Sequence, residues 1–425
     1  MSVETSIPNP RRALATVFAI VFVDLLGFGI LIPIIPLYAE SFGATEFVVG
    51  LLIASYSAMQ FIGAPVLGRL SDERGRRPIL LISLLGSVIA WTLFGVATSL
   101  LVLFAARMLA GLMGGNIATA QAYIADITPP EDRAKGLGLV GAAFGLGFVF
   151  GPALGGVFSS PTMVDGVRSF VPTIVPITEF TLPSFVAAAV SAVNLLMAVV
   201  VLPETRHTEG APDRRSRFDR LREALTDPAL SGLVAAFFLF SLAFSGMESM
   251  FVLFTKDSFG YGPTMNGYIL AYVGVVIAIV QGGLVGRLTT RFGELRLALV
   301  GIGFMAITLV LLPLSPWIGG RAPGLAMLGL AAGLIALLLV LTVLSVGNGL
   351  ANVSMTTLVS KHAGEEEQGG AFGLTQSAGS IARTIGPVVA GGLYTAGSYW
   401  LPFVLGGVLM VPILGILSTR AFRPD

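Results

Sequence analysis

The sequence predicts an all-α polytopic membrane protein with twelve transmembrane helices, arranged as two six-helix halves in parallel repeat around a central cavity. Of its 425 residues, 55% are apolar and 12% are charged, whereas soluble domains carry about 25% charged residues. A soluble globule has too little interior to bury that much apolar surface. Because one membrane span takes about 20 apolar residues, the apolar content suffices for about twelve spans.

Twelve apolar runs fit helices of this length, six on each side of the one long charged segment. The first six are predicted at 12–40, 45–68, 78–98, 100–126, 135–158 and 181–203. The second six are predicted at 229–255, 264–286, 296–315, 324–359, 368–396 and 399–419. The first run is too long for a cleavable signal and is read as a retained helix.

The charged segment predicts the domain division. We expect an N-terminal half over residues 1–203, a cytoplasmic linker over 204–227 and a C-terminal half over 228–425. Within the linker, 214–225 fits either a short amphipathic helix or a solvated chain. With the N-terminus inside, 20 of the 25 Lys and Arg residues fall in cytoplasmic segments, 3 fall outside and 2 fall within spans. The excess of positive charge on cytoplasmic loops predicts that both termini are cytoplasmic.

A repeated loop indicates that the two halves are related. GRLSDERGRRPIL begins at Gly68, and GRLTTRFGELRLAL begins 218 residues later at Gly286. Gly75 recurs as Gly293 at the same offset of 218 residues. A second pair, GPALGG and GPVVAGG, lies near the outer end of the fifth helix of each half. Two related six-helix halves place a binding site between them, near the middle of the bilayer.

These motifs resemble the major facilitator superfamily of transporters over nearly the whole chain. GRLSDERGRR is similar to the family's signature between helices 2 and 3, and RMLAG at Arg107 to its fourth-helix motif. GAAFGLGFVFGPALGG resembles the fifth-helix motif of proton-coupled antiporters. VDLLGFGILIPIIPLY, AYIADIT and EEEQGGAFG resemble the tetracycline/proton antiporter branch. The resemblance implies a multi-pass transporter of a prokaryotic inner membrane, driven by a proton gradient and without a cofactor.

The sequence departs from the family pattern at three places. Glu73 stands where the signature has Arg, and Thr290 stands in the second copy where the first has Asp72. The predicted extracellular stretch at about 159–182 is longer than the family's short loop, and an ordered cap or a neutral insertion fits it equally well.

Several function classes are excluded. No GK[ST] sequence supports a phosphate-binding loop, and the single GxGxxG, at 136–141, has no strand before it. There is no GxSxG elbow, no cysteine and no paired histidine, so we expect neither an enzyme nor a metal site. A net charge of +1 gives no sign of a nucleic-acid partner. We expect a monomer in the bilayer whose partners are protons and a small-molecule substrate.

Four ionisable residues fall within predicted spans and become candidates for proton coupling, because charges in the membrane are costly. They are Asp24, Glu248, Arg107 and Arg383. Asp24 lies 12 residues after Arg12, about 18 Å along a helix and so near the midplane. Desolvation raises the pKa of a carboxyl and a neighbouring Arg lowers it. A change in the distance between the Arg and the acid would therefore load and release a proton. The alternatives are static packing pairs and, for Glu248, contact with a cationic substrate.

The family signature implies a set of gating residues. The resemblance implies that Asp72 caps the helix that begins near Gln368 and that Arg76 pairs with Asp126. Simple anchoring by positive charge on the cytoplasmic side is the alternative. The full set is Gly68, Asp72, Gly75, Arg76, Arg77, Asp126, Gly286 and Gly293.

The fifth helix carries a run of small residues around a proline. Such faces let helices pack backbone to backbone. The motif therefore fits helix packing alone or, as the alternative, a seam that seals one end of the pathway between the halves. The motif comprises Gly147, Gly151, Pro152, Gly155 and Gly156.

Polar and aromatic side chains on the predicted spans are candidates for a substrate cavity. The sequence favours export of a lipophilic drug-like compound, of tetracycline type or multidrug, in exchange for protons, and hence antibiotic resistance. The alternatives are a proton-coupled symporter or uniporter of a sugar or other small metabolite, and a sensor that moves nothing. The cavity candidates are Gln60, Asn116, Gln121, Phe251, Asn348, Asn352 and Gln376.

Overall fold

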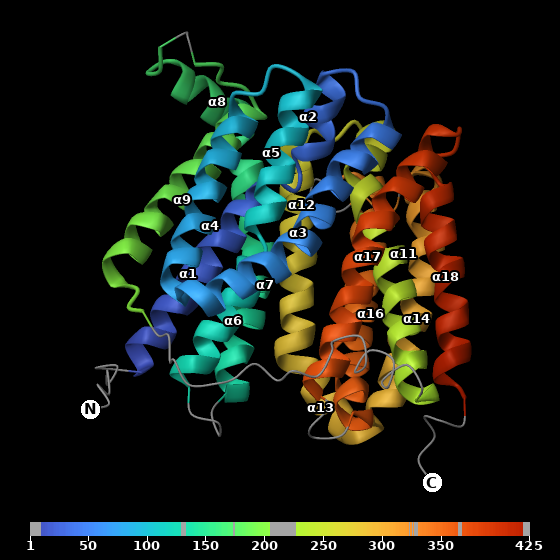
Figure 1. The fold of residues 1–425 in the computed structure, drawn as a ribbon. Helices are drawn as coiled ribbons and strands as arrows, with labels where there is room; N and C mark the ends of the chain where they lie inside the picture. Colours follow the sequence, from blue (N-terminus) through green and yellow to red (C-terminus); the bar gives the residue numbers. More distant parts are fainter. Residues whose placement is uncertain are drawn as a thin grey trace. The chain divides into compact units, whose positions relative to one another are not determined.

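A computed structural model describes residues 10–128, 133–172, 175–204, 227–322, 324, 326, 330–363 and 368–419. Long helices dominate this part of the chain (Figure 1). Nearly all of the predicted linker, including the possible helix at 214–225, lies outside the described residues. The all-helical, multi-span architecture is confirmed, because ten described helical stretches are long and apolar enough to cross a membrane.

Before the linker, α1, α3, α4, α5, α7 and α9 begin close to where the apolar runs predict them, and α2, α6 and α8 are additional helices. They are α1 (Pro10–Leu31), α2 (Ile35–Ser41), α3 (Glu46–Arg74), α4 (Arg76–Gly95), α5 (Leu100–Met113), α6 (Asn116–Ile127), α7 (Arg133–Phe158), α8 (Pro161–Arg168) and α9 (Thr181–Val201).

The helices that follow the linker include one π-helix and one 3₁₀ turn. They are α11 (Pro228–Phe259), α12 (Pro263–Ile279), the π-helix η2 (Val280–Leu284), α13 (Val285–Phe292), α14 (Glu294–Leu311), the 3₁₀ turn η3 (Leu312–Leu314), α15 (Ser315–Arg321), α16 (Ala332–His362), α17 (Gln368–Thr395) and α18 (Leu401–Leu417). α18 is apolar but has only 17 residues, and α17 is longer but lies outside the ten candidate spans. The count of twelve spans adds these two helices and stays a prediction.

Two predicted spans of the first half are interrupted where the backbone requires it. The first breaks between α1 and α2 around Pro33, which has no N–H for the helix ladder. The fourth breaks at Gly114 and Gly115, where the backbone of α3 passes so closely that a Cβ on Gly115 would lie 2.6 Å from the amide nitrogen of Ala64. The side-chain amide of Gln60 donates to the Gly114 carbonyl at 3.1 Å and so satisfies a group that the break leaves open.

The contacts group the chain into two compact units. The first comprises Met1–Tyr38, Ala58–Ala211 and Pro263–Ala271, and the second comprises Ala39–Ser57, Pro212–Gly262 and Tyr272–Asp425. α3 and α12 therefore each contribute to both units, a feature that the division at the linker does not include. The predicted domain boundaries themselves stay a prediction.

The same helix pairs pack together in each unit. In the first, α1 packs on α7 and α9, and α4 packs on α5 and α9. In the second, α11 packs on α17 and α18, and α14 packs on α16 and α18. Since α1 and α11 open the two predicted halves, the pairs occupy equivalent places in the repeat.

The long stretch after α7 is ordered where the structure describes it, and the sequence did not predict its helix. α8 begins after Ser160, whose hydroxyl accepts from the Met163 amide at 3.4 Å. The Arg168 guanidinium donates to the Ile177 carbonyl at 2.7 Å and ties the end of α8 to the segment that precedes α9. Beneath it, Val164, Ile177 and Leu182 form a buried apolar cluster.

Candidate functional site

Asp24 lies in the middle of α1 and faces α4 and α6 of the first unit. Asn116 donates its side-chain amide to Asp24 Oδ2 at 3.3 Å, and Ser87 donates its hydroxyl to Oδ1 at 3.4 Å. Asn116 is the first residue of α6, directly after the break at Gly114 and Gly115. The interruption of the fourth span therefore sets the position of the amide that reaches Asp24.

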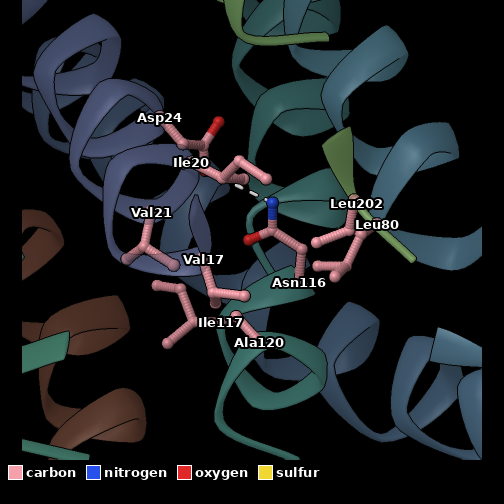
Figure 2. Close-up of a pocket in the computed structure, with 9 residues that line it drawn as sticks. All are labelled: Val17, Ile20, Val21, Asp24, Leu80, Asn116, Ile117, Ala120 and Leu202. Carbon is pink, nitrogen blue, oxygen red and sulfur yellow. Dashed lines mark hydrogen bonds between the residues drawn. The ribbon is translucent and has the colours of Figure 1, made fainter. Parts of the chain in front are cut away.

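The Asp24 carboxyl opens onto a small pocket, with the Asn116 amide turned toward it (Figure 2). The pocket has room for about one water molecule. Asp24 and Asn116 are its polar lining residues, and the apolar ones are Val17, Ile20, Val21, Leu80, Ile117, Ala120 and Leu202. A site of this size suits a proton and its carrier water and is too small for a drug-sized molecule, which needs several hundred cubic ångströms.

Arg107 lies in α5 and is almost fully buried, with 2% of its surface exposed. Its guanidinium carbon stands 5.8 Å from the centre of the Phe28 ring, a cation–π contact. Phe28 follows Asp24 by four residues and so lies one turn further along α1. The structure thus places Arg107 against α1 through an aromatic ring, one turn from the acid.

Glu248 and Arg383 lie on neighbouring helices of the second unit, α11 and α17. The two charges interact electrostatically, and Arg383 also interacts with the phenol of Tyr56. Arg383 donates to the Ser380 hydroxyl at 3.0 Å. The two candidates that the sequence placed in the C-terminal half are therefore neighbours.

The turn between α3 and α4 gathers the charges of the loop signature. Arg76 donates to Asp126 at 3.1 Å and also contacts Asp72 and Ser71. Asp72 is mostly exposed, and its predicted contact with the start of α17 stays a prediction. Gly75 has φ 102° and ψ 156°, a conformation that is essentially confined to glycine.

The sequence reasoning missed the residue that closes this turn. Glu204 accepts from the backbone amides of Arg76 and Arg77, at 2.9 and 3.3 Å, and so caps the first turn of α4. A Cβ on Gly75 would come within 2.5 Å of the same carboxylate. Composition assigned Glu204 to the linker, and only its position in space shows that it belongs to the turn.

The second copy of the loop adopts the same backbone with the opposite charges. Gly293 has φ 78° and ψ 157° and precedes α14 as Gly75 precedes α4. At the position equivalent to Arg76 stands Glu294, which accepts from Lys361 at 2.6 Å near the end of α16. Gly68 and Gly286 meet no neighbouring atom within 4 Å of a built Cβ, so close packing does not explain why glycine recurs there.

The small residues of the fifth-span motif face α1. A Cβ on Gly147 would lie 2.9 Å from Leu25 Cβ, and one on Gly151 would lie 2.6 Å from Gly29 Cα. A Cβ on Gly155 would likewise overlap the Ile30 carbonyl oxygen. Gly156 points instead to α12, where a Cβ would lie 3.1 Å from Gly267 Cα. The motif packs helices within the first unit, and its sealing role stays a prediction.

The seven cavity candidates are divided between the two units. Gln60 and Asn116 hold the contacts described above, and Phe251 and Asn348 are buried in the second unit. The remaining three, whose side chains are exposed, are Gln121, Asn352 and Gln376. A shared cavity for all seven stays a prediction.

Residues 17–336 and 318–424 match the model of the Major Facilitator Superfamily. The chain belongs to this superfamily. It is therefore a multi-pass membrane transporter and not an enzyme.

Two relatives and one solved structure show what the chain is similar to. The chain is 30% identical to the class C tetracycline resistance protein of Escherichia coli, over 97% of this chain and 98% of that one. It is 26% identical to multidrug resistance protein 2 of Bacillus subtilis strain 168, over 97% and 96%. The crystal structure of the human organic anion transporter MFSD10 (TETRAN) shares the fold, with a TM-score of 0.64, 24% identity and coverage of 97% and 100%.

Proposed function

We propose that the protein exports a lipophilic drug-like compound across the cell membrane in exchange for protons that pass through Asp24. Its full-length relatives include a tetracycline resistance protein and a multidrug resistance protein. The observation that carries the proposal is the Asp24 pocket, in which an acid within a span meets two neutral polar side chains and room for one water.

The two partners of Asp24 suit an acid that changes its protonation state. A carboxylate only accepts hydrogen bonds, whereas a protonated carboxyl must also donate one. The Ser87 hydroxyl and the Asn116 side-chain amide can each donate or accept after a rotation. The same two residues therefore satisfy Asp24 with and without its proton, which a fixed cation would not do.

Transport in proteoliposomes with an imposed pH gradient tests the proposal. The purified protein should accumulate tetracycline or a multidrug-type dye against its gradient only when protons flow the opposite way. Asp24→Asn should lose the uphill movement and keep part of the downhill exchange, because exchange requires no net proton step. Uphill transport by Asp24→Asn at the wild-type rate would overturn the assignment.

The symport alternative gives a distinct result in the same vesicles. A symporter or uniporter of a sugar or metabolite would move its substrate with the proton, or without any response to the gradient. Reporter fusions test the proposed orientation separately. A fusion after residue 210 should report the cytoplasm, and a periplasmic signal there would reverse the topology.

A further inference from the structure

The second unit holds two opposite charges on α11 and α17, helices that pack closely through glycine. α11 and α17 pack backbone to backbone, because a Cβ on Gly386 would meet the Ser245 hydroxyl and lie 2.8 Å from the Leu242 carbonyl. Glu248 lies three residues after Ser245, and Arg383 lies three residues before Gly386. Both residues therefore lie within one helical turn of this contact.

These charges do not form a closed ion pair. Among the described residues, no nitrogen of Arg383 lies within 4.0 Å of a Glu248 oxygen, although the two groups interact electrostatically. Arg383 is instead held back along its own helix, where it donates to Ser380 and its Nη1 lies 3.2 Å from a Cβ built on Gly379. A charge pair inside a protein stabilises it only with close geometry, so a separated pair is a poor packing device.

Aromatic rings accompany the acid. Phe244 precedes Glu248 by one turn of α11 and stacks on Phe240, with ring centres 6.4 Å apart and planes at 5°. The phenol of Tyr56, on α3, interacts electrostatically with Arg383. An aromatic ring thus stands one helical turn from the acid, and a phenol interacts electrostatically with the guanidinium.

We propose that Glu248 and Arg383 bind the opposite ends of one aromatic zwitterion. Glu248 receives the cationic nitrogen and Arg383 receives the anionic oxygens, which a guanidinium binds through two parallel hydrogen bonds. Phe244 packs on the apolar ring system between them. The proposal rests on the proposed function in one respect, since it takes this ligand to be the exported compound.

Three xanthene dyes test the ligand class with one ring scaffold. Rhodamine B carries a cation and a carboxylate, its ethyl ester keeps only the cation, and fluorescein is an anion. Binding is measured by fluorescence polarisation with protein in lipid nanodiscs, after subtraction of empty discs. The wild type should bind rhodamine B about tenfold more tightly than the ester, as expected for one charge-assisted pair, and fluorescein more weakly than both.

Two variants assign the charges to their residues. Arg383→Gln should bring the ratio of rhodamine B to ester binding close to one while ester binding stays unchanged. Glu248→Gln should weaken both dyes about tenfold and leave their ratio intact. Lys256→Gln, which removes an exposed cation from the same helix α11, is the matched control and should change neither.

Separate outcomes overturn this site and the proposed function. A wild-type ratio near one, a ratio that survives Arg383→Gln, or the absence of dye binding above empty discs would each overturn the zwitterion site. Lower melting temperatures in both variants with unchanged dye selectivity would show a packing pair instead. Asp24→Asn should keep the dye ratio, so a failure of proton coupling is recognised by its own readout.

Discussion

The two units each place an acid on the first helix of a predicted half, but they surround it differently. Asp24 on α1 meets the neutral donors Asn116 and Ser87. Glu248 on α11 interacts electrostatically with the permanent charge of Arg383. When Asp24 takes a proton, its polar cluster changes from one negative charge to none. The Glu248–Arg383 cluster is neutral as long as the acid is ionised, and it gains a positive charge on protonation.

On our proposal, this difference separates the residue that carries a proton from the residues that recognise a charged ligand. A cluster that becomes neutral on protonation no longer has the free-energy cost of a charge within the membrane. This property suits a residue that carries a proton. A cluster with both signs present offers a ligand two opposite contacts. On this proposal, the equivalent helices α1 and α11 of a duplicated fold serve two distinct tasks.

The largest expected effect comes from exchanging the acids for amides in turn. Asp24→Asn should abolish gradient-driven accumulation of substrate, whereas Glu248→Gln should raise the substrate concentration needed for half-maximal transport and retain coupling. Counterflow and pH-gradient assays on the same vesicle preparations separate the two effects. Equal loss of coupling in both variants would remove the distinction between the units.

A smaller effect is expected from the neutral partner of Asp24. Asn116→Ala removes one hydrogen bond to a charged group, worth about 1.5–3 kcal/mol, and should slow coupled transport by about 10- to 100-fold. Ser87→Ala should cost less, because its contact is the longer of the two at 3.4 Å. Both rates are measured at a fixed pH gradient, with thermal unfolding as the control for folding. A reversed order would place the main contact on Ser87.

The two turns of the repeat allow a stability comparison. Gly75 and Gly293 share a positive φ, so an Ala at either position should cost about 1–3 kcal/mol of strain. Gly75→Ala should cost more, since its Cβ would also push against the capping carboxylate of Glu204, whereas a Cβ on Gly293 meets no atom within 4 Å. Melting temperatures in detergent measure the two losses of stability. The additional loss caused by Gly75→Ala should be smaller when Glu204 is already replaced by Ala.

The charges of the first turn give a graded prediction for transport. Arg76→Ala should reduce transport without loss of substrate binding, because it weakens a turn and not a binding site. Asp126→Asn should have a larger effect than Asp72→Asn, since 27% of the Asp126 side chain is exposed against 64% for Asp72. Transport rates alongside binding curves test this order. Loss of binding in Arg76→Ala with normal alternation would contradict a role in gating.

Much of the fold was predictable because the apolar runs and the repeated Gly75 and Gly293 report directly on local conformation. The interruptions were not predictable, because a proline or glycine within an apolar run is tolerated in a membrane helix. Only the close approach of α3 to Gly115 explains the break in the fourth span. For the site, the cost of burying a charge identified Asp24 and Glu248. Ser87, Glu204 and Tyr56 have ordinary sequence contexts, and their roles depend on contacts between distant segments.

The smallest expected effect sharpens the comparison of the two turns. Lys361 and Glu294 form the counterpart of Arg76 and Asp126, but the Lys361 side chain is 57% exposed, and such pairs contribute about 0–1 kcal/mol. Lys361→Ala should therefore lower stability by no more than about 1 kcal/mol, and less at high salt, where exposed charges are screened. Arg76→Ala removes a cation whose side chain is only 17% exposed and that touches two acids, so its loss should be larger and less sensitive to salt. Unfolding of both variants at low and high salt measures the difference, and equal losses with equal salt dependence would mean that the reversal of charge leaves the two turns equivalent.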